Sequence, residues 1–503
     1  MKTIVLGPPG TGKTTTLLSL VDDFMKAGIE PKRIGYFSFT RKAAHEAASR
    51  AAEKFNLDEK EDLIYFRTLH SLAFRLLGVK KERVMKQADY REFGLKVGIP
   101  IKMAMRSEND GIFNSDNEYL RLINKARVTE RDLMDVYDDN LHNLDIERDT
   151  LYLLDRELTK YKHEKGMIDY DDMLADFIKQ DVSPSFDVLF IDEAQDLSPL
   201  QWRMVRALWS KANKTYIAGD DDQAIFKWAG ADVDTFIALK EEVDCVDTLD
   251  QSYRIPGGPI HELSQSIIRN VTNRYQKEYR PRQEIGDLLR YSDVTQVDMS
   301  QGQWLVLSSA NYFLDDIKDL CELQGWYYAH KHKNSIKLDL LLAIQTWEKW
   351  RKQEHSLPVT SIKNIYSYLG DNVTKGYRTG KTFNEENNYD IAECTEDHGL
   401  QTQDVWYKAF DGLDAETENY IRNMLANKEK ISQTPRIILS TIHAAKGGEA
   451  DNVLLLPDIT KSSVDQNDVD PDELHRLFYV AVTRAKKSLH ILEPKNYDRA
   501  YVL

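Results

Sequence analysis

The segment that most restricts the fold is GPPGTGKT, residues 7–14, because it separates two different hydrophobic patterns. The run TIVL before it is typical of a buried strand, and the leucines and valine of TTTLLSLV after it recur at helical spacing. A strand, a glycine-rich loop and a helix in this order are the context that a phosphate-binding loop requires. The sequence therefore predicts an α/β fold that binds a nucleotide at this loop.

The loop residues have distinct predicted roles. Three glycines let the backbone N–H groups face the phosphates, and the positive end of the following helix points the same way. We expect Lys13 to reach the β- and γ-phosphates and Thr14 to bind Mg²⁺. The predicted nucleotide contacts are Gly7, Pro8, Pro9, Gly10, Thr11, Gly12, Lys13, Thr14 and Thr15.

A second glycine-rich segment, GYRTGKT at 376–382, does not fit the same pattern. Only three residues separate Gly376 from Gly380, where the pattern needs four, and no apolar strand precedes them. We interpret this segment as a basic surface loop.

The segment FDVLFIDEAQD, residues 186–196, is a second buried-strand pattern that ends in carboxylates. Since α/β sheets bind ligands at the carboxyl ends of their strands, we expect Asp192 and Glu193 beside the phosphate loop. Asp192 is predicted to hold Mg²⁺ through water, and Glu193 to orient or deprotonate the attacking water.

Length and composition restrict the remaining possibilities. A chain of 503 residues exceeds one compact core, so we expect two large lobes with insertions. The formal net charge of −15 means that any nucleic acid must be held in a groove where a few cationic groups are concentrated. Three distant cysteines without a CxxC pair suit a reducing compartment, and no run of about 18 apolar residues occurs. We expect a cytoplasmic protein that does not cross a membrane.

Nine segments in a fixed order resemble the UvrD/Rep-like family of superfamily 1 DNA helicases. They are GPPGTGKT (7–14), FSFTRKAA (37–44), RTLHSLAFRLL (67–77), IDYDDML (168–174), DEAQD (192–196), GDDDQAIFKWAGAD (219–232), LDQSYR (249–254), STIHAAKGGE (440–449) and YVAVTRAKKSL (479–489).

The resemblance implies two tandem RecA-like phosphate-loop lobes, with parallel sheets flanked by helices and a mainly helical subdomain inserted in each. We expect the first lobe at 1–77 and 166–246, and its insertion at 78–165. The second lobe is expected at 247–349 and 434–503, with its insertion at 350–433.

The resemblance also implies the remaining ATP contacts. Arg254 and Arg484 would be directed at the γ-phosphate, and Gln223 would sense it. Tyr253 is similar to the residue that stacks on the base, and Glu449 to the one that meets the ribose.

Single-stranded DNA is expected to cross both lobes. By the same resemblance its contacts would be Phe39, Thr40, Thr68, His70, Ser71, Phe226, Trp228, Thr441 and His443. Alternatives stay open for several of them, because Phe226 suits core packing, His70 suits a structural histidine, and the 440–449 segment suits bracing the cleft.

The sequence departs from the family pattern at Ala229, where relatives carry arginine, and at Gly448, where they carry a larger apolar residue. Only six residues precede Gly7, so the upstream glutamine that reads adenine has no counterpart, and we expect poor discrimination between purine nucleotides. The nineteen residues after Arg484 leave no room for a fused nuclease.

The insertions carry weaker signals. Residues 129–149 hold eight acids against two arginines, which suits a solvated helical surface rather than a phosphate-binding face. In the second insertion Lys375, Arg378 and Lys381 suit either duplex phosphates or a solvated loop, and the 350–433 region is a candidate surface for a protein partner.

The resemblance implies an ATP- and Mg²⁺-dependent helicase that moves 3′ to 5′ on single-stranded DNA and acts at single-strand/duplex junctions, and neither spacing nor charge gives that direction. We expect a monomer that serves DNA repair or replication. One alternative is a translocase that displaces proteins, or serves a repair or defence complex, without unwinding alone. Another is a phosphate-loop kinase or nucleotide switch, which leaves Tyr253, Arg484 and the 440–449 segment without a role.

Overall fold

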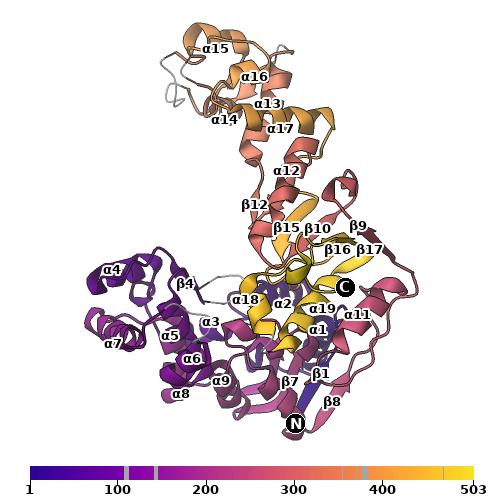
Figure 1. Cartoon of the computed structure of the whole chain (residues 1–503). Coiled ribbons are helices and arrows are strands. Elements are labelled where there is room, and N and C mark those ends of the chain that lie inside the picture. The colour runs from indigo at the N-terminus through magenta and orange to yellow at the C-terminus, as the bar shows by residue number, and fades with distance from the viewer. Residues whose placement is uncertain (107–112, 141–145, 354, 371, 376–382, 468–469) are drawn as a thin grey trace. The chain divides into compact units, whose positions relative to one another are not determined.

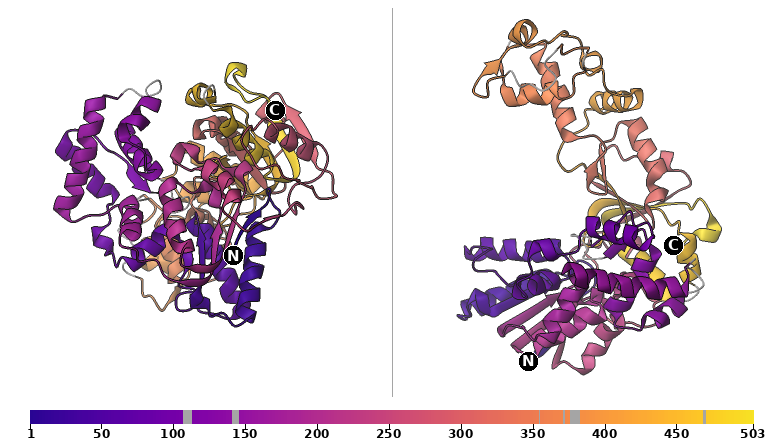
Figure 2. Two further views of the ribbon diagram at one scale, coloured as in Figure 1. Left: turned by 90° about the horizontal axis from the view of Figure 1, so that it is seen from below. Right: turned by 90° about the vertical axis from the view of Figure 1, so that its left-hand side faces the viewer.

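The structure is a computed structural model that describes residues 1–503 except 107–112, 141–145, 354, 371, 376–382 and 468–469. The chain forms two units. Unit 1 comprises Met1–Asp287, Thr460–Lys487 and Leu503, and unit 2 comprises Leu288–Ile459 and Ser488–Val502. Figure 1 labels many of the elements of both units, and Figure 2 gives two further views. No described helix combines the length and the apolar character needed to span a bilayer.

Unit 1 contains a six-stranded sheet in the order β3-β2-β6-β7-β1-β8, in which all neighbouring strands are parallel. Its strands are β1 (Lys2–Leu6), β2 (Ile34–Ser38), β3 (Phe66–Thr68), β6 (Phe186–Asp192), β7 (Ala212–Gly219) and β8 (Cys245–Thr248). The central strands are almost continuously apolar because both of their faces are covered, as in β2, where all five residues are buried.

Helices α1 and α2 cover one face of this sheet. Leu17 and Val21 of α1 and Ala47 of α2 share a hydrophobic cluster with Tyr36 and Phe190 of the strands. The helices of unit 1 outside the inserted region are α1 (Lys13–Lys26), α2 (Arg41–Phe55), α3 (Leu69–Leu76), α8 (Tyr170–Lys179), α9 (Pro199–Trp209), α10 (Val233–Ala238), α11 (Pro259–Ile268), α18 (Lys461–Asn467) and α19 (Pro471–Val482).

The inserted region between α3 and α8 is mainly helical where it is described, as the fold class predicted. Its elements are α4 (Gln87–Val97), β4 (Ala104–Arg106), β5 (Phe113–Ser115), α5 (Glu118–Thr129), α6 (Leu133–Asn140) and α7 (Arg148–Lys165). They share a hydrophobic cluster of their own. Arg127 of α5 donates hydrogen bonds of 2.6 and 2.9 Å to the Asp169 carboxylate, and Lys162 of α7 donates one of 2.7 Å. This buried ion cluster joins the insertion to the start of α8.

Unit 2 is built on a seven-stranded sheet in the order β12-β11-β15-β10-β16-β17-β9. The pairs β11-β15, β10-β15 and β10-β16 are parallel, whereas β11-β12 is antiparallel. Its strands are β9 (Asp287–Tyr291), β10 (Trp304–Ser308), β11 (Tyr328–His330), β12 (Lys333–Asn334), β15 (Ile437–Thr441), β16 (Ala450–Leu455) and β17 (Ala485–Leu492), of which β9 and β17 begin with residues of unit 1. These two sheets, with helices packed on them, confirm the predicted fold class.

The remaining elements of unit 2 are α12 and the helical region between β12 and β15. They are α12 (Asp315–Gln324), α13 (Leu338–Trp350), β13 (Leu357–Pro358), α14 (Val359–Tyr366), β14 (Asn388–Tyr389), α15 (Ile391–Asp397), α16 (Trp406–Ala409) and α17 (Ala415–Ala426). Trp347 and Trp350 are fully buried in a cluster that includes sheet residues such as Val306. The segment 376–382, predicted to be a basic surface loop, and with it Arg378 and Lys381, lie outside the described residues.

The strand register of unit 1 brings the predicted motifs to one edge of the sheet. Leu6 at the end of β1 pairs with Gly219 of β7 and Thr248 of β8, and Ser38 of β2 pairs with Asp192 of β6. Because parallel strands end together, the loops that begin at residues 7, 39, 193, 220 and 249 leave the sheet at the same edge. This is the edge at which α/β sheets bind ligands.

Candidate functional site

The phosphate loop has the conformation that its glycines permit. Gly10 and Gly12 have φ values of +75° and +83°, in the left-handed region where a side chain is strained. The Lys13 ammonium group is buried and donates a hydrogen bond of 2.6 Å to the Gly7 carbonyl. Lys13 therefore lies folded against the loop, with its charge at the site predicted for the phosphates.

Asp192 lies where β6 ends and accepts two hydroxyl hydrogen bonds on one oxygen. Thr14 donates at 2.9 Å and Tyr36 at 2.8 Å. Burial, and then the negative charge of Glu193, raise the pKa of Asp192 to about 6. A buried carboxylate beside a hydroxyl and a second carboxylate suits a hard divalent cation, because the cation would offset the cost of its charge.

Glu193 stands at a strained backbone position, with a φ of +55° that is uncommon for a residue other than glycine. Its carboxylate accepts a 2.6 Å hydrogen bond from the Gln195 side chain, whose oxygen accepts the backbone N–H of Asp220 at 3.0 Å. Gln195 is fully buried and joins the Glu193 loop to the segment that follows β7. Gln195 lies in the DEAQD segment, but its position there predicted no role for it.

Gln223 and Arg484 meet in the interior of unit 1. The Arg484 guanidinium donates a 2.9 Å hydrogen bond to the Gln223 side-chain oxygen, and the Gln223 amide donates at 2.7 Å to Asp220. Arg484 is only 1% exposed. Burial, and then the positive charge of Arg254, lower the pKa of Arg484 to about 9, so it remains protonated at neutral pH. Two predicted arginine fingers thus lie close enough to repel one another.

The segment of Tyr253 and Arg254 packs against the phosphate loop. The Tyr253 N–H donates a 2.8 Å hydrogen bond to the Gly10 carbonyl. A Cβ atom placed on Gly10 would lie 2.4 Å from the Arg254 Cβ, so only glycine allows this approach. The Tyr253 side chain is 73% exposed beside Gly12, which leaves its ring accessible to a base.

The aromatic residues after Gln223 differ in exposure. Phe226 is buried and stacks on Phe39 with ring centroids 5.8 Å apart, whereas Trp228 is 40% exposed. The Trp228 N–H donates a 3.3 Å hydrogen bond to Glu473 of α19, and Lys227 forms an ion pair with Asp470. The segment from Asp220 to Trp228 therefore contacts the region of α19 at more than one point.

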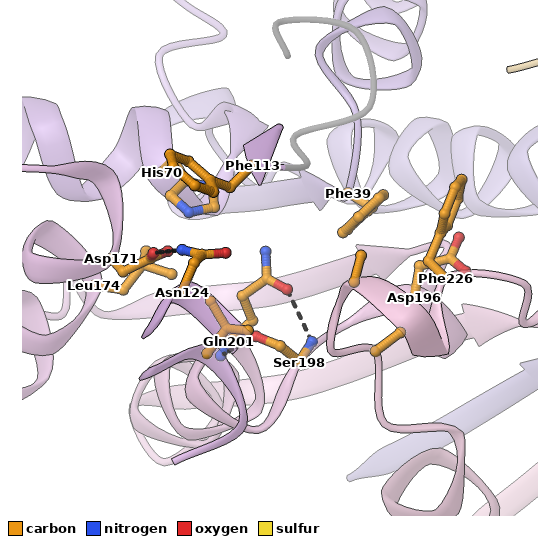
Figure 3. A pocket seen from close by; sticks show the side chains of 13 residues that line it. Phe39, His70, Phe113, Asn124, Asp171, Leu174, Asp196, Ser198, Gln201 and Phe226 are labelled. Carbon is orange, nitrogen blue, oxygen red and sulfur yellow. Dashed lines mark hydrogen bonds between the residues drawn. The ribbon is translucent and has the colours of Figure 1, made fainter. Parts of the chain in front are cut away.

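A pocket in unit 1 collects several of the predicted DNA-contacting side chains. Figure 3 shows His70 and Phe226 toward opposite ends of it, with Phe39 beside Phe226. Asn124, which donates a hydrogen bond to Asp171, and Gln201 line the wall between the ends. His70 is buried and lies edge-to-face with Tyr170, with ring centroids 5.9 Å apart.

The remaining predicted ligand contacts fall into two groups, one that caps helices of unit 1 and one that lies in unit 2. Thr40 and Thr68 accept hydrogen bonds from the first turns of α2 and α3, so their hydroxyls act as N-caps. Thr441 ends β15 opposite Ser308 of β10, His443 lies in the turn that follows, and Glu449 is exposed just before β16. Direct contact of these residues with ligands stays a prediction.

Comparisons with known proteins identify the family of the chain. Residues 1–244 match the family model described as UvrD/REP helicase N-terminal domain, and residues 437–492 match the one described as UvrD-like helicase C-terminal domain. The chain belongs to the UvrD/Rep helicase family, whose members use ATP.

Similar proteins carry helicase names. A "Probable DNA helicase II homolog" of Mycoplasma pneumoniae is 24% identical, over 97% of this chain and 81% of its own. An "ATP-dependent DNA helicase Rep" of Buchnera aphidicola is 22% identical, over 97% and 91% of the two chains. An "ATP-dependent DNA helicase PcrA" of Leuconostoc citreum is 24% identical, over 73% of this chain and 48% of its own.

The raised pKa of Asp192 predicts a specific effect of pH on stability. Its folded pKa of about 6 exceeds the ordinary value of 3.8, so the folded state binds the proton more tightly and this carboxyl disfavours folding as pH rises through that window. We expect the stability of Asp192→Asn, relative to the wild type, to increase from pH 4 to pH 7. Chemical denaturation of the nucleotide-free proteins measures it.

The matched control is Asp23→Asn, because Asp23 is an exposed carboxylate on α1. We expect the stability of this variant relative to the wild type to be the same at pH 4 and pH 7. A relative stability of Asp192→Asn that is the same at both pH values would contradict the assigned burial cost.

Proposed function

We propose that this protein is an ATP-driven translocase and helicase that moves along single-stranded DNA and separates duplex strands. The proposal rests mainly on the contacts and exposure of the short segment from Asp220 to Trp228. At one end Gln223 accepts a hydrogen bond from Arg484, and at the other Trp228 exposes an indole. One segment thus has a group suited to a phosphate and a surface suited to a base.

The hydrolysis step would use side chains at the carboxyl edge of the first sheet. Glu193 would orient the attacking water and accept its proton. Lys13, Arg254 and Arg484 would stabilise the negative charge that develops on the γ-phosphate oxygens. The mutual repulsion of Arg254 and Arg484 supports this assignment, because a polyanion would relieve it.

The residues also fit Mg²⁺. We propose that Thr14 and Asp192 hold it, and when bound it would neutralise phosphate charge and orient the nucleotide. The 2.9 Å contact between the Thr14 hydroxyl and the Asp192 carboxylate supports this pairing.

DNA binding would combine base stacking with backbone contacts. Trp228 would stack on a base, and stacking contributes roughly 1–3 kcal/mol per base whatever the sequence. Phe39, Phe226 and His70 are buried around a pocket too small to hold a base, so they would contact DNA only at its mouth. Thr40, Thr68, Thr441 and His443 would contact the DNA backbone through hydroxyl, ring and N–H groups.

The architecture that we propose divides the motor into two RecA-like lobes, at 1–77 with 166–246 and at 247–349 with 434–503, each carrying its insertion. Movement would be 3′ to 5′, by a monomer that engages single-strand/duplex junctions, with Tyr253 stacking on the base and Glu449 meeting the ribose of ATP. The insertion at 350–433 would serve a protein partner or duplex DNA.

A translocase that only displaces proteins is the second candidate from the same chemistry. A kinase or switch that uses the phosphate loop alone is less well supported, because Tyr253 hydrogen-bonds to that loop and Arg484 to Gln223.

Glu193→Gln tests the hydrolysis step. The amide keeps the shape of the carboxylate but cannot accept a proton, so we expect ATP binding within about threefold of the wild type and a turnover at least about 100-fold lower. Steady-state ATPase rates and nucleotide binding by fluorescence measure the two effects. Turnover within a few-fold of the wild type would remove Glu193 from the reaction.

Trp228→Ala tests the DNA-facing end. Loss of one stacking partner is expected to weaken binding of a single-stranded oligonucleotide by roughly 5- to 100-fold, while ATP hydrolysis without DNA stays within about twofold. Tyr312→Ala, an exposed aromatic of unit 2 without a predicted role, is the control and should change neither. Equal DNA affinity of wild type and Trp228→Ala would contradict the assignment.

Unwinding of duplexes with 3′ or 5′ single-stranded tails tests the whole proposal. We expect ATP-dependent strand separation from the 3′-tailed duplex only. DNA-stimulated hydrolysis without unwinding would favour the protein-displacing translocase, and hydrolysis that ignores DNA would favour the kinase or switch.

A further inference from the structure

Three consecutive carboxylates are buried around one lysine in unit 1. The ammonium group of Lys277 lies 3.1 Å from Asp220, 2.5 Å from Asp221 and 2.9 Å from Asp222. None of the four side chains is more than 1% exposed. Lys277 lies outside the nine segments that resemble the helicase family, and the proposed chemistry does not use it.

Arg274 completes the charge cluster. Its guanidinium holds both oxygens of Asp222, at 2.7 and 2.5 Å, and the N–H of Tyr275 donates to Asp221 at 2.7 Å. Three carboxylates therefore face two cations. Buried ion clusters contribute little net stability, because desolvation offsets most of the attraction. This cluster is therefore better explained by a role in fixing one conformation than by a contribution to the stability of the fold.

The chain segment that carries these cations is also fastened to α19. Asp472 accepts hydrogen bonds from the N–H of Thr272 at 3.0 Å, from its hydroxyl at 2.9 Å and from the N–H of Asn273 at 3.2 Å. Arg476, one turn further along α19, donates at 2.6 Å to the Asn273 carbonyl. The segment Thr272–Lys277 thus joins the helix that precedes Arg484 to the acids that precede Gln223.

Asp220 connects this cluster to Gln223. One carboxylate oxygen of Asp220 lies 3.1 Å from the Lys277 ammonium group, and the other accepts the Gln223 amide at 2.7 Å. With its amide held in this way, the side-chain oxygen of Gln223 faces Arg484 at 2.9 Å. A lysine that fixes Asp220 therefore also fixes which atom of Gln223 is presented to the arginine.

We propose that Lys277 is a positioning residue for ATP hydrolysis, acting through Asp220 to hold Gln223 in register with Arg484. The inference rests on the proposed function, since it assumes that Gln223 and Arg484 act on the γ-phosphate. Lys277 contacts neither of them in the contacts described above, so its effect would pass through the carboxylates that it holds, with Asp220 as the direct link to the Gln223 side chain.

A double-mutant cycle between Lys277→Met and Gln223→Ala tests the proposal. Each single variant is expected to lower kcat for ATP by about 10- to 100-fold with KM within about threefold, because neither change removes a phosphate-binding group of the loop. The double variant should fall no more than about twofold below the slower single variant, since both changes remove one function. Effects that multiply, or a raised KM with normal kcat, would overturn the proposal.

Arg274→Met is the matched control. It removes a cation from the same cluster, but one that holds Asp222 and leaves the contact between Lys277 and Asp220 in place. We expect kcat within about threefold of the wild type, and an undiminished effect of Gln223→Ala in this background. A loss as large as that of Lys277→Met would mean that any damage to the cluster slows hydrolysis, which would overturn the specific role of Lys277.

Folding is checked by circular dichroism and thermal melting. If Lys277→Met does not fold, the pair Lys277→Met with Asp221→Asn removes one charge of each sign and replaces Lys277→Met as one arm of the cycle with Gln223→Ala. Because the cycle is measured without DNA as well as with it, failure of DNA to stimulate hydrolysis would count against the translocase alone. Multiplying effects in an enzyme that DNA stimulates would count against Lys277 alone.

Discussion

The hydrogen bond from Arg484 to Gln223 joins residues 261 positions apart and is the contact on which the rest of the site depends. Arg484 follows the C-terminal end of α19, whereas Glu473, near its N-terminal end, accepts the Trp228 N–H. The segment from Asp220 to Trp228 therefore contacts both ends of a helix about 18 Å long. A change at Gln223 can reach the indole through a stiff element rather than through a flexible loop.

The charges around this contact explain why it suits a nucleotide. Burial lowers the pKa of Arg484 with help from the charge of Arg254, and burial raises the pKa of Asp192 with help from that of Glu193. The site thus brings two positive charges near each other and two negative charges near each other, and both arrangements cost free energy in the absence of ligand. A polyphosphate would offset the repulsion between the arginines, and its cation would offset the repulsion between the carboxylates. Binding of the nucleotide would therefore also stabilise one arrangement of these side chains.

Local patterns predicted the fold more completely than the site. The strand and helix on either side of the phosphate loop, and the strand that ends at Asp192, follow from hydrophobic spacing and glycine positions, and the structure confirms these elements. The links of Tyr36 to Asp192 and of Lys277 to Asp220 could not be predicted, because polar partners far apart in sequence have no spacing rule. The sequence left core packing open for Phe226, and the structure decides it, because Phe226 is buried whereas Trp228 is 40% exposed.

The coupling between the two ends of the Asp220–Trp228 segment is measured most directly as the effect of the bound nucleotide on the affinity for DNA. The affinity for a single-stranded oligonucleotide is determined at fixed salt with ADP and with a non-hydrolysable ATP analogue, in the wild type and in Gln223→Ala. We predict that the wild-type Kd differs by at least about fivefold between the two nucleotides, and that this ratio falls to about one in Gln223→Ala. Equal wild-type affinities, or a ratio that survives the loss of Gln223, would contradict it.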